Sequence, residues 1–223
     1  MKTTVGAITI GQAPRVDLVP EIVEMTGGNI SFVEKGALDD LTPEEIEELS
    51  PKRDEPTLVT RLKDGTQVIV GKKRIEEKVQ EKIDLLETEE VDFVVLLCSG
   101  SFKNIKSNVP LLFPNGLLLG TLSSLTLPNY LGFLVPSKTQ VPSATKEFES
   151  VGFSPVGLGA SPYSNSEEVW KAAERLRDKN VDLIVLHCFG YTGQMKREVS
   201  EIAEKPVVLV RSVLARFLSE ITG

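Results

Sequence analysis

The sequence predicts an α/β protein with two pseudo-symmetric, doubly wound domains, each built on a parallel sheet. The first observation behind this fold class is an internal repeat: residues 91–102 align without gaps on residues 181–192, and six of the twelve positions are identical. The second is that each copy is a continuous β-branched and aliphatic run, typical of a parallel strand that is buried on both faces. The third is that helical patterns lie between the strands, as βαβ units require.

The first half begins with a strand at residues 5–10 that runs into a polar loop. Residues 42–45 have the pattern of a capping box with proline at the first helical position, which predicts a short helix that ends near Leu49. Residues 72–89 carry apolar side chains on one helical face, and these are Ile75, Val79, Ile83 and Leu86. We expect that face to pack on the first sheet.

A β-hairpin is expected near residues 57–70. Two strand-like segments there flank Asp64-Gly65, a dipeptide favoured in two-residue hairpin turns. We expect the hairpin to decorate the surface. The hairpin and the apolar residues 117–119 are the features of the sequence that suit a homodimer contact.

The second half repeats the organisation of the first. Residues 131–137 echo residues 5–14, as a strand that runs into a polar loop. Ser166 is expected to cap the next helix. Residues 205–210 predict a last strand and residues 212–221 a closing helix, which we expect to return to the first half. The predicted domains are residues 1–110 together with 206–223, and residues 111–205.

Composition and charge exclude several classes of partner. The 223 residues are 41% hydrophobic and 26% charged, as in a globular protein. Lys and Arg number 25 against 32 Asp and Glu, a net charge of −7, and no basic stripe is present to neutralise phosphates, so we expect no nucleic-acid partner. The apolar segment 111–135 is interrupted before it reaches the ~20 residues of a membrane helix, so we expect no membrane association. The N-terminal apolar run is too short for a secretory signal, and we expect a cytoplasmic protein.

Cys98 and Cys188 are the candidate catalytic residues. They occupy matched positions of the repeat, at the carboxyl ends of predicted parallel strands, where open α/β sheets bind ligands. One cysteine so placed would more simply be a core residue, but two at matched positions favour a functional role. We expect them to face each other across a cleft between the halves, which would hold the active site. No CxxC motif is present and His187 is the only histidine, so no metal site is expected.

Two thiols on opposite faces of an acidic carbon can invert that centre without a cofactor. One thiolate removes a proton while the other thiol supplies one. A single thiol in the same pocket could instead protonate an enediolate after decarboxylation, or add to a double bond and permit cis-trans isomerisation. A non-catalytic metabolite-binding or regulatory protein with the same fold is the third hypothesis.

Residues beside the cysteines and after the first strand are candidates for substrate binding. Gln12 and Arg15 lie in a loop expected to overhang the cleft, and Arg15 could clamp a carboxylate through two parallel hydrogen bonds or be a solvated surface residue. His187 is expected to be structural, because neighbouring strand residues point to opposite faces. Hydroxyls and exposed amides that could bind an oxyanion come from Ser99, Gly100, Ser101, Gly190, Tyr191 and Thr192.

Five segments carry a resemblance to a known family, and they are residues 8–11, 36–51, 64–74, 185–190 and 206–216. Through them the chain resembles the AroM family over nearly its whole length. The resemblance implies a place near the aspartate/glutamate racemase superfamily, which includes amino-acid and hydantoin racemases, maleate isomerase and arylmalonate decarboxylase. It also implies two pseudo-symmetric α/β domains, no cofactor, and catalytic cysteines after equivalent strands.

The resemblance assigns roles by position. Cys98 and Cys188 match the two catalytic thiols of the superfamily. Ser99 and Gly100 match its first carboxylate-binding turn, Phe189 to Tyr191 match the second, and Ser137 matches a substrate-contacting position. The Ser-Gly-Ser and Phe-Gly-Tyr turns differ from the racemase pattern and speak against aspartate or glutamate as the substrate. The sequence thus predicts a cofactor-independent isomerase, a racemase or epimerase of a small carboxylate.

Overall fold

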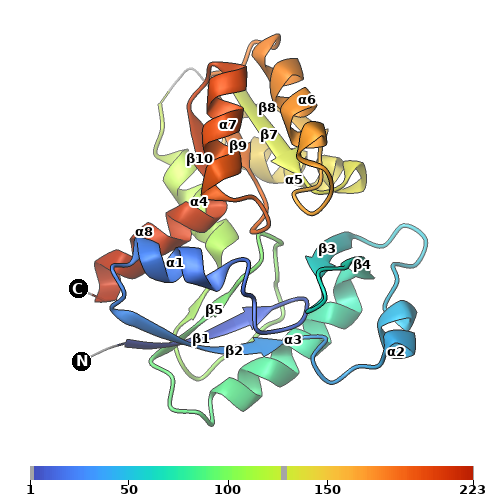
Figure 1. The fold of residues 1–223 in the computed structure, drawn as a ribbon, viewed down its shortest axis with the longest axis vertical. Helices are drawn as coiled ribbons and strands as arrows, with labels where there is room; N and C mark the ends of the chain where they lie inside the picture. The colour runs from blue at the N-terminus through green and yellow to red at the C-terminus, as the bar shows by residue number, and fades with distance from the viewer. Residues whose placement is uncertain (1–2, 127–129, 223) are drawn as a thin grey trace. The chain divides into compact units, whose positions relative to one another are not determined.

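Two parallel sheets organise the chain, one in each of two structural units (Figure 1). The computed structural model describes residues 3–126 and 130–222. The first unit comprises Met1–Pro114 and Ala215–Gly223, and the second comprises Asn115–Leu214. The α/β class with parallel sheets, predicted from the repeat, is confirmed.

The sheet of the first unit has the strand order β2-β1-β5-β6, with every pair parallel. Its strands are β1 (Thr3–Thr9), β2 (Ile30–Gly36), β5 (Phe93–Leu96) and β6 (Leu111–Leu112). The central strands β1 and β5 are buried on both faces, and this accounts for their continuous aliphatic sequences.

Three helices lie wholly within the first unit: α1 (Val19–Met25), α2 (Pro43–Glu48) and α3 (Lys72–Leu86). The predicted capping box of α2 is present, with the Thr42 hydroxyl accepting from the Glu45 N–H. The predicted face of α3 is fully buried, as expected. Helix α1 was not predicted, because seven residues with proline near the start are too few to show a helical period.

The expected hairpin consists of β3 (Thr57–Arg61) and β4 (Gln67–Gly71), paired antiparallel. The Leu62 N–H donates to the Thr66 carbonyl at 2.8 Å, so the loop between these residues is longer by one than the predicted two-residue turn. Gly65 adopts φ 92°, a left-handed conformation that favours glycine. The hairpin packs into the apolar core of its unit through Leu58 and Val70, so it is more than a surface decoration.

The sheet of the second unit has the order β10-β9-β7-β8, again with every pair parallel. Its strands are β7 (Tyr130–Val135), β8 (Ser154–Gly159), β9 (Leu183–Leu186) and β10 (Val207–Leu209). Read in chain order, β7, β8, β9 and β10 take the places of β1, β2, β5 and β6. The two sheets therefore have the same connectivity, and the predicted pseudo-symmetry is confirmed.

The remaining helices are α4 (Pro114–Ser123), the short 3₁₀ helix η1 (Lys138–Gln140), α5 (Val141–Ser150), α6 (Ser166–Arg177), α7 (Gly193–Ala203) and α8 (Val210–Thr222). The cap of α6 is Asn165, whose side chain accepts from the Glu167 N–H, so the prediction of Ser166 as the cap was wrong by one residue. Across residues 3–126 and 130–222, no helix combines the length and apolar character needed to span a bilayer.

The repeat extends to individual hydrogen bonds. The Asp92 carboxylate accepts from the Thr4 N–H at 2.7 Å, and the Asp182 carboxylate accepts from the Tyr130 N–H at 3.2 Å. Each aspartate thereby joins the start of its own strand to the start of the neighbouring strand. The repeated Val-Asp dipeptide therefore has the same structural role in both units.

Candidate active site

Cys98 and Cys188 have the same backbone environment. Each follows the last residue of its strand, β5 or β9, by two positions. The Gly100 N–H donates to the Cys98 sulfur at 3.3 Å, and the Gly190 N–H donates to the Cys188 sulfur at 3.4 Å. Both cysteines are free thiols, 9% and 8% exposed. A backbone donor directed at sulfur stabilises the thiolate, the form that acts as a base, whereas burial of the sulfur disfavours it.

The side chains around the Cys98 turn are apolar. A Cβ atom built on Gly100 would lie 3.0 Å from Leu58 Cδ2, 3.3 Å from Phe102 Cε2 and 3.4 Å from the Cys98 sulfur. Leu58 comes from the hairpin, and all three side chains belong to one buried cluster. The predicted residues Ser99 and Ser101 flank this glycine and are half-buried. The hairpin residue Leu58 was missed in the sequence, because forty positions separate it from Cys98 and no local pattern links them.

The turn after Cys188 is more tightly enclosed. A Cβ on Gly190 would lie 2.5 Å from Tyr163 Cζ and 2.6 Å from Pro162 Cγ, so only glycine fits there. Tyr191 is fully buried and its hydroxyl donates to the Ala160 carbonyl at 2.5 Å. Burial, with a smaller contribution from the charge of Cys188, raises the pKa of Tyr191 well above its usual value, so the phenol stays protonated.

Arg211 fixes the backbone next to Cys188. This arginine is 1% exposed and lies in the first turn of α8. Its Nε donates to the Phe189 carbonyl at 3.0 Å, and its Nη2 donates to the same oxygen. The predicted residue Phe189 therefore provides a backbone anchor, and its side chain is buried. Arg211 was missed, although an arginine directly after a buried strand and at the start of a helix is a signal that could have found it.

Two predicted residues cap helices at the carboxyl edge of the second sheet. Thr192 is the N-cap of α7, with its hydroxyl accepting from the Met195 N–H at 3.1 Å. Ser137 follows β7, the neighbour of β9, and its hydroxyl accepts from the Thr139 N–H at 3.3 Å. Both therefore lie at the edge of the sheet that carries Cys188, and the positive end of the α7 dipole follows the Cys188 turn.

His187 is structural, as its position predicted. Its Nε2 lies 2.9 Å from Asn115 Oδ1, and its ring packs edge-on against Phe148 with centroids 5.1 Å apart. Burial lowers its pKa from 6.5 to about 4, so the imidazole is neutral near pH 7. The Asn115 amide donates in turn to Glu147 Oε2 at 2.9 Å. These contacts fix the imidazole among core residues, so it is not part of a dyad with Cys188.

Arg15 is buried within the first unit, with 4% of its surface exposed. Its Nε and Nη2 donate to the two carboxylate oxygens of Asp17, each at 2.8 Å, and its Nη1 donates to the Thr9 hydroxyl at 2.9 Å. Burial raises the pKa of Asp17, but the hydrogen bond and charge of Arg15 outweigh it and the pKa lies below its usual value. Binding a substrate carboxylate to Arg15 stays a prediction, and it requires the displacement of Asp17.

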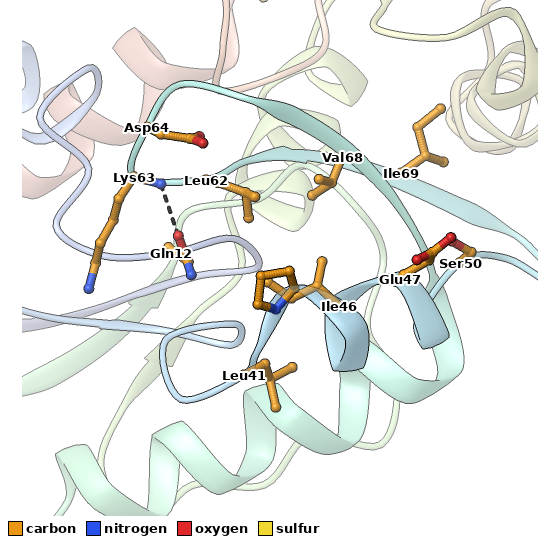
Figure 2. A pocket seen from close by; sticks show the side chains of 11 residues that line it. Gln12, Leu41, Ile46, Glu47, Ser50, Leu62, Lys63, Asp64, Val68 and Ile69 are labelled. Atoms are coloured by element: carbon orange, nitrogen blue, oxygen red, sulfur yellow. Dashed lines mark hydrogen bonds between the residues drawn. The ribbon is translucent and has the colours of Figure 1, made fainter.

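Gln12 lines a pocket of about 500 Å³ between the hairpin and α2 (Figure 2). Its Oε1 accepts from the Lys63 N–H at 3.0 Å, and its Nε2 donates to the Leu38 carbonyl at 3.3 Å. Leu62 and Ile46 supply apolar walls of this pocket. The lining residues do not include Cys98, so the described pocket does not bring Gln12 and that thiol together.

The structure thus gathers the predicted residues other than Gln12 and Arg15 into two groups. Cys98, Ser99, Gly100 and Ser101 form the turn after β5, and Cys188, Phe189, Gly190, Tyr191, Thr192 and Ser137 surround the end of β9. Among residues 3–126 and 130–222, no group of three or more His, Cys, Asp and Glu side chains is arranged to hold a metal ion. The chemistry available at both groups is that of a thiol with backbone N–H donors.

Comparison with known proteins gives a family and a set of related folds. The AroM protein family matches residues 5–222, whereas no curated protein matches the chain. The aspartate racemase of Picrophilus torridus is 17% identical with a TM-score of 0.66, over 99% of this chain and 94% of that one. Unliganded arylmalonate decarboxylase is 16% identical with a TM-score of 0.62, over 99% and 93%. The glutamate racemase of Aquifex pyrophilus is 15% identical with a TM-score of 0.62, over 98% and 84%. These likenesses show a shared fold.

Proposed function

The chain belongs to the AroM family, and we propose that this protein is a cofactor-independent racemase or epimerase of a small carboxylate, with Cys98 and Cys188 as its acid and base. The observation that carries the proposal is the duplicated cysteine turn. Each sulfur accepts an N–H from the glycine two residues on, at 3.3 and 3.4 Å, after equivalent strands. The related folds of aspartate and glutamate racemases support it.

The reaction needs one thiolate and one thiol. The thiolate accepts the proton from the α-carbon, and the electron pair of the broken C–H bond delocalises into the carboxylate as an enediolate. The second thiol then donates its proton to the opposite face of that carbon and becomes the thiolate. Each turnover therefore exchanges the two protonation states, and the reverse reaction starts from the exchanged state. The N–H of Gly100 or Gly190 stabilises whichever sulfur carries the charge.

Backbone groups at the Cys188 turn suit an anionic substrate. The N-terminus of α7, capped by Thr192, follows this turn, and a helix N-terminus attracts anions. Arg211 holds the Phe189 carbonyl and so keeps the N–H groups of the turn in a fixed orientation. Preorganised donors of this kind stabilise developing negative charge on an enediolate without having to rearrange.

Alkylation of the two cysteines tests the proposal without knowledge of the substrate. Mass spectrometry would follow the reaction of each thiol with iodoacetamide in the folded protein, with and without a panel of small carboxylates. We expect at least one thiol to react and a carboxylate to protect it. If both thiols are inert until the protein unfolds, and no carboxylate changes this, the racemase proposal fails. Saturable carboxylate binding that survives replacement of both cysteines would indicate a metabolite-binding protein.

A one-thiol decarboxylase or cis-trans isomerase is the second candidate, and the unequal side chains around the two turns favour it. Leu58 and Phe102 surround the Cys98 turn, whereas Pro162, Tyr163 and the buried Arg211 hold the Cys188 turn. The fold is also shared with arylmalonate decarboxylase. Near-normal turnover in Cys98→Ser, together with loss of turnover in Cys188→Ser, would select this mechanism.

A further inference from the structure

The β3–β4 hairpin covers the carboxyl edge of the first sheet at two points. At the end of β1, a Cβ on Gly11 would lie 2.4 Å from Thr60 Oγ1. At the turn after β5, Leu58 lies against Gly100, as described above. The Gln12 N–H donates to the Arg61 carbonyl at 3.3 Å and binds the hairpin to the loop after β1. The hairpin therefore spans the ends of two neighbouring strands, including the one that carries Cys98.

Strand alternation determines which hairpin residues face this edge. Leu58 and Thr60 are two positions apart and so point to the same face of β3, where their cross-strand partners are Val70 and Val68. Leu58 is 6% exposed and Val70 is fully buried. The inner face of the hairpin is thus mainly apolar, and Leu58 is the member of it that reaches the cysteine turn.

We propose that Leu58 is a specificity-determining residue, and that it selects a substrate with an apolar substituent on the reacting carbon. This inference rests on the proposed function, since it takes Cys98 as an acid or base. Leu58 Cδ2, Phe102 Cε2 and the Cys98 sulfur converge on the same point beside Gly100. A substituent on a carbon that contacts this sulfur also reaches Leu58 and Phe102. A charged or strongly polar substituent would lose its hydration there without gaining a partner, whereas an apolar one gains buried contact area.

The test compares Leu58→Ala with Val70→Ala. Val70 is the matched control, because it pairs with Leu58 across the hairpin and belongs to the same buried cluster, but is not among the atoms nearest Gly100. The probes are 2-phenylpropionate and malate, which differ in the substituent on the carbon next to the carboxylate. Protection of Cys98 from iodoacetamide gives an apparent Kd for each acid in each variant. Solvent deuterium exchange at the same carbon gives kcat and KM.

In the wild type we expect 2-phenylpropionate to protect Cys98 at least ~10-fold better than malate, because one apolar pocket contact changes affinity by roughly 10 to 200-fold. Leu58→Ala should reduce that preference about tenfold, mainly by raising the apparent Kd and the KM for 2-phenylpropionate. Val70→Ala should keep the wild-type preference, although both variants lose stability. If Leu58 had only a structural role, Leu58→Ala and Val70→Ala would change the preference for 2-phenylpropionate over malate by the same amount.

Two results would overturn the inference while leaving the proposed function intact. One is exchange that prefers malate, and the other is an equal change of preference in Leu58→Ala and Val70→Ala. If no carboxylate protects either thiol and none undergoes exchange, the proposed function itself fails. The two failures are therefore separated by whether any carboxylate reacts.

Discussion

Single residues explain why the two cysteine turns share a backbone but tolerate different changes. Both glycines donate to a cysteine sulfur. Gly190, however, faces the ring carbons of Tyr163 and Pro162, whereas Gly100 faces the end of the flexible Leu58 side chain. Equivalent positions in the repeat therefore carry different steric limits.

We predict that Gly190→Ala destabilises the protein much more than Gly100→Ala. A methyl group on Gly190 would lie 2.5 Å from Tyr163 Cζ, so packed rings must move, which costs about 1–3 kcal/mol. On Gly100 the closest atom is at 3.0 Å and belongs to Leu58, which can adjust. Urea unfolding measures both free energies. Equal losses would contradict the described packing of the Cys188 turn.

A pH dependence of stability follows from His187. Its pKa falls from 6.5 to about 4 in the folded protein because the ring is buried, so the unfolded chain binds the extra proton between these values. Stability should be complete above pH 6.5 and should fall by up to roughly 3 kcal/mol as the pH drops to 4. The difference in unfolding free energy between wild type and His187→Gln, measured from pH 4 to 7, isolates this contribution from that of the carboxylates. A difference that does not vary with pH would show that His187 is not buried as described.

At the scale of secondary-structure elements, the hairpin contains a buried polar atom that costs stability. Among the described residues, Thr60 Oγ1 is a buried side-chain oxygen without a hydrogen-bond partner. Thr60→Val keeps the shape and removes the hydroxyl, and we expect it to raise the unfolding free energy by about 1 kcal/mol. Thermal and urea unfolding would detect the change. A loss of stability would mean that the hydroxyl has a partner in solution.

The start of α6 provides a second prediction for a single element. The Asn165 side chain accepts from the Glu167 N–H at 3.0 Å and caps the helix. Asn165→Ala should cost about 1 kcal/mol, and Ser166→Ala, one residue inside the helix, should change stability by less than about 0.5 kcal/mol. A larger loss of stability in Ser166→Ala than in Asn165→Ala would show that Ser166 is the cap, as the sequence predicted.

The elements also show which parts of the fold a sequence can predict. The strands that carry the cysteines, the α3 face and the hairpin follow from local patterns of apolar and turn residues, and the structure contains them. The short α1 has no such pattern. The positions of Leu58 beside Gly100 and of Arg211 beside Phe189 depend on contacts between distant segments, which no local pattern encodes. The same holds for Arg15. Its partner Asp17 is only two residues away in the sequence, but the burial of Arg15 depends on the folded unit and is not encoded by a local pattern.

At the scale of the whole chain, the repeat has produced two sheets with the same strand order and the same aspartate and cysteine positions. Such a duplication can supply a two-base reaction, because it provides a base and an acid of the same kind for the two faces of one carbon. Under the proposed function, the unequal surroundings of the two thiols would distinguish the substituents on that carbon. The central claim is therefore that both thiols act, each on one face.

The stereochemistry of deuterium incorporation tests that claim most directly. One enantiomer of a carboxylate that the protein turns over would be incubated in heavy water, and the label in substrate and product followed at early times. Two thiols predict deuterium in the product enantiomer and almost none in the recovered substrate, with racemisation reduced at least ~10²-fold in both Cys98→Ser and Cys188→Ser. Equal labelling of the two enantiomers, or full activity in Cys98→Ser, would contradict the account and leave a single acting thiol.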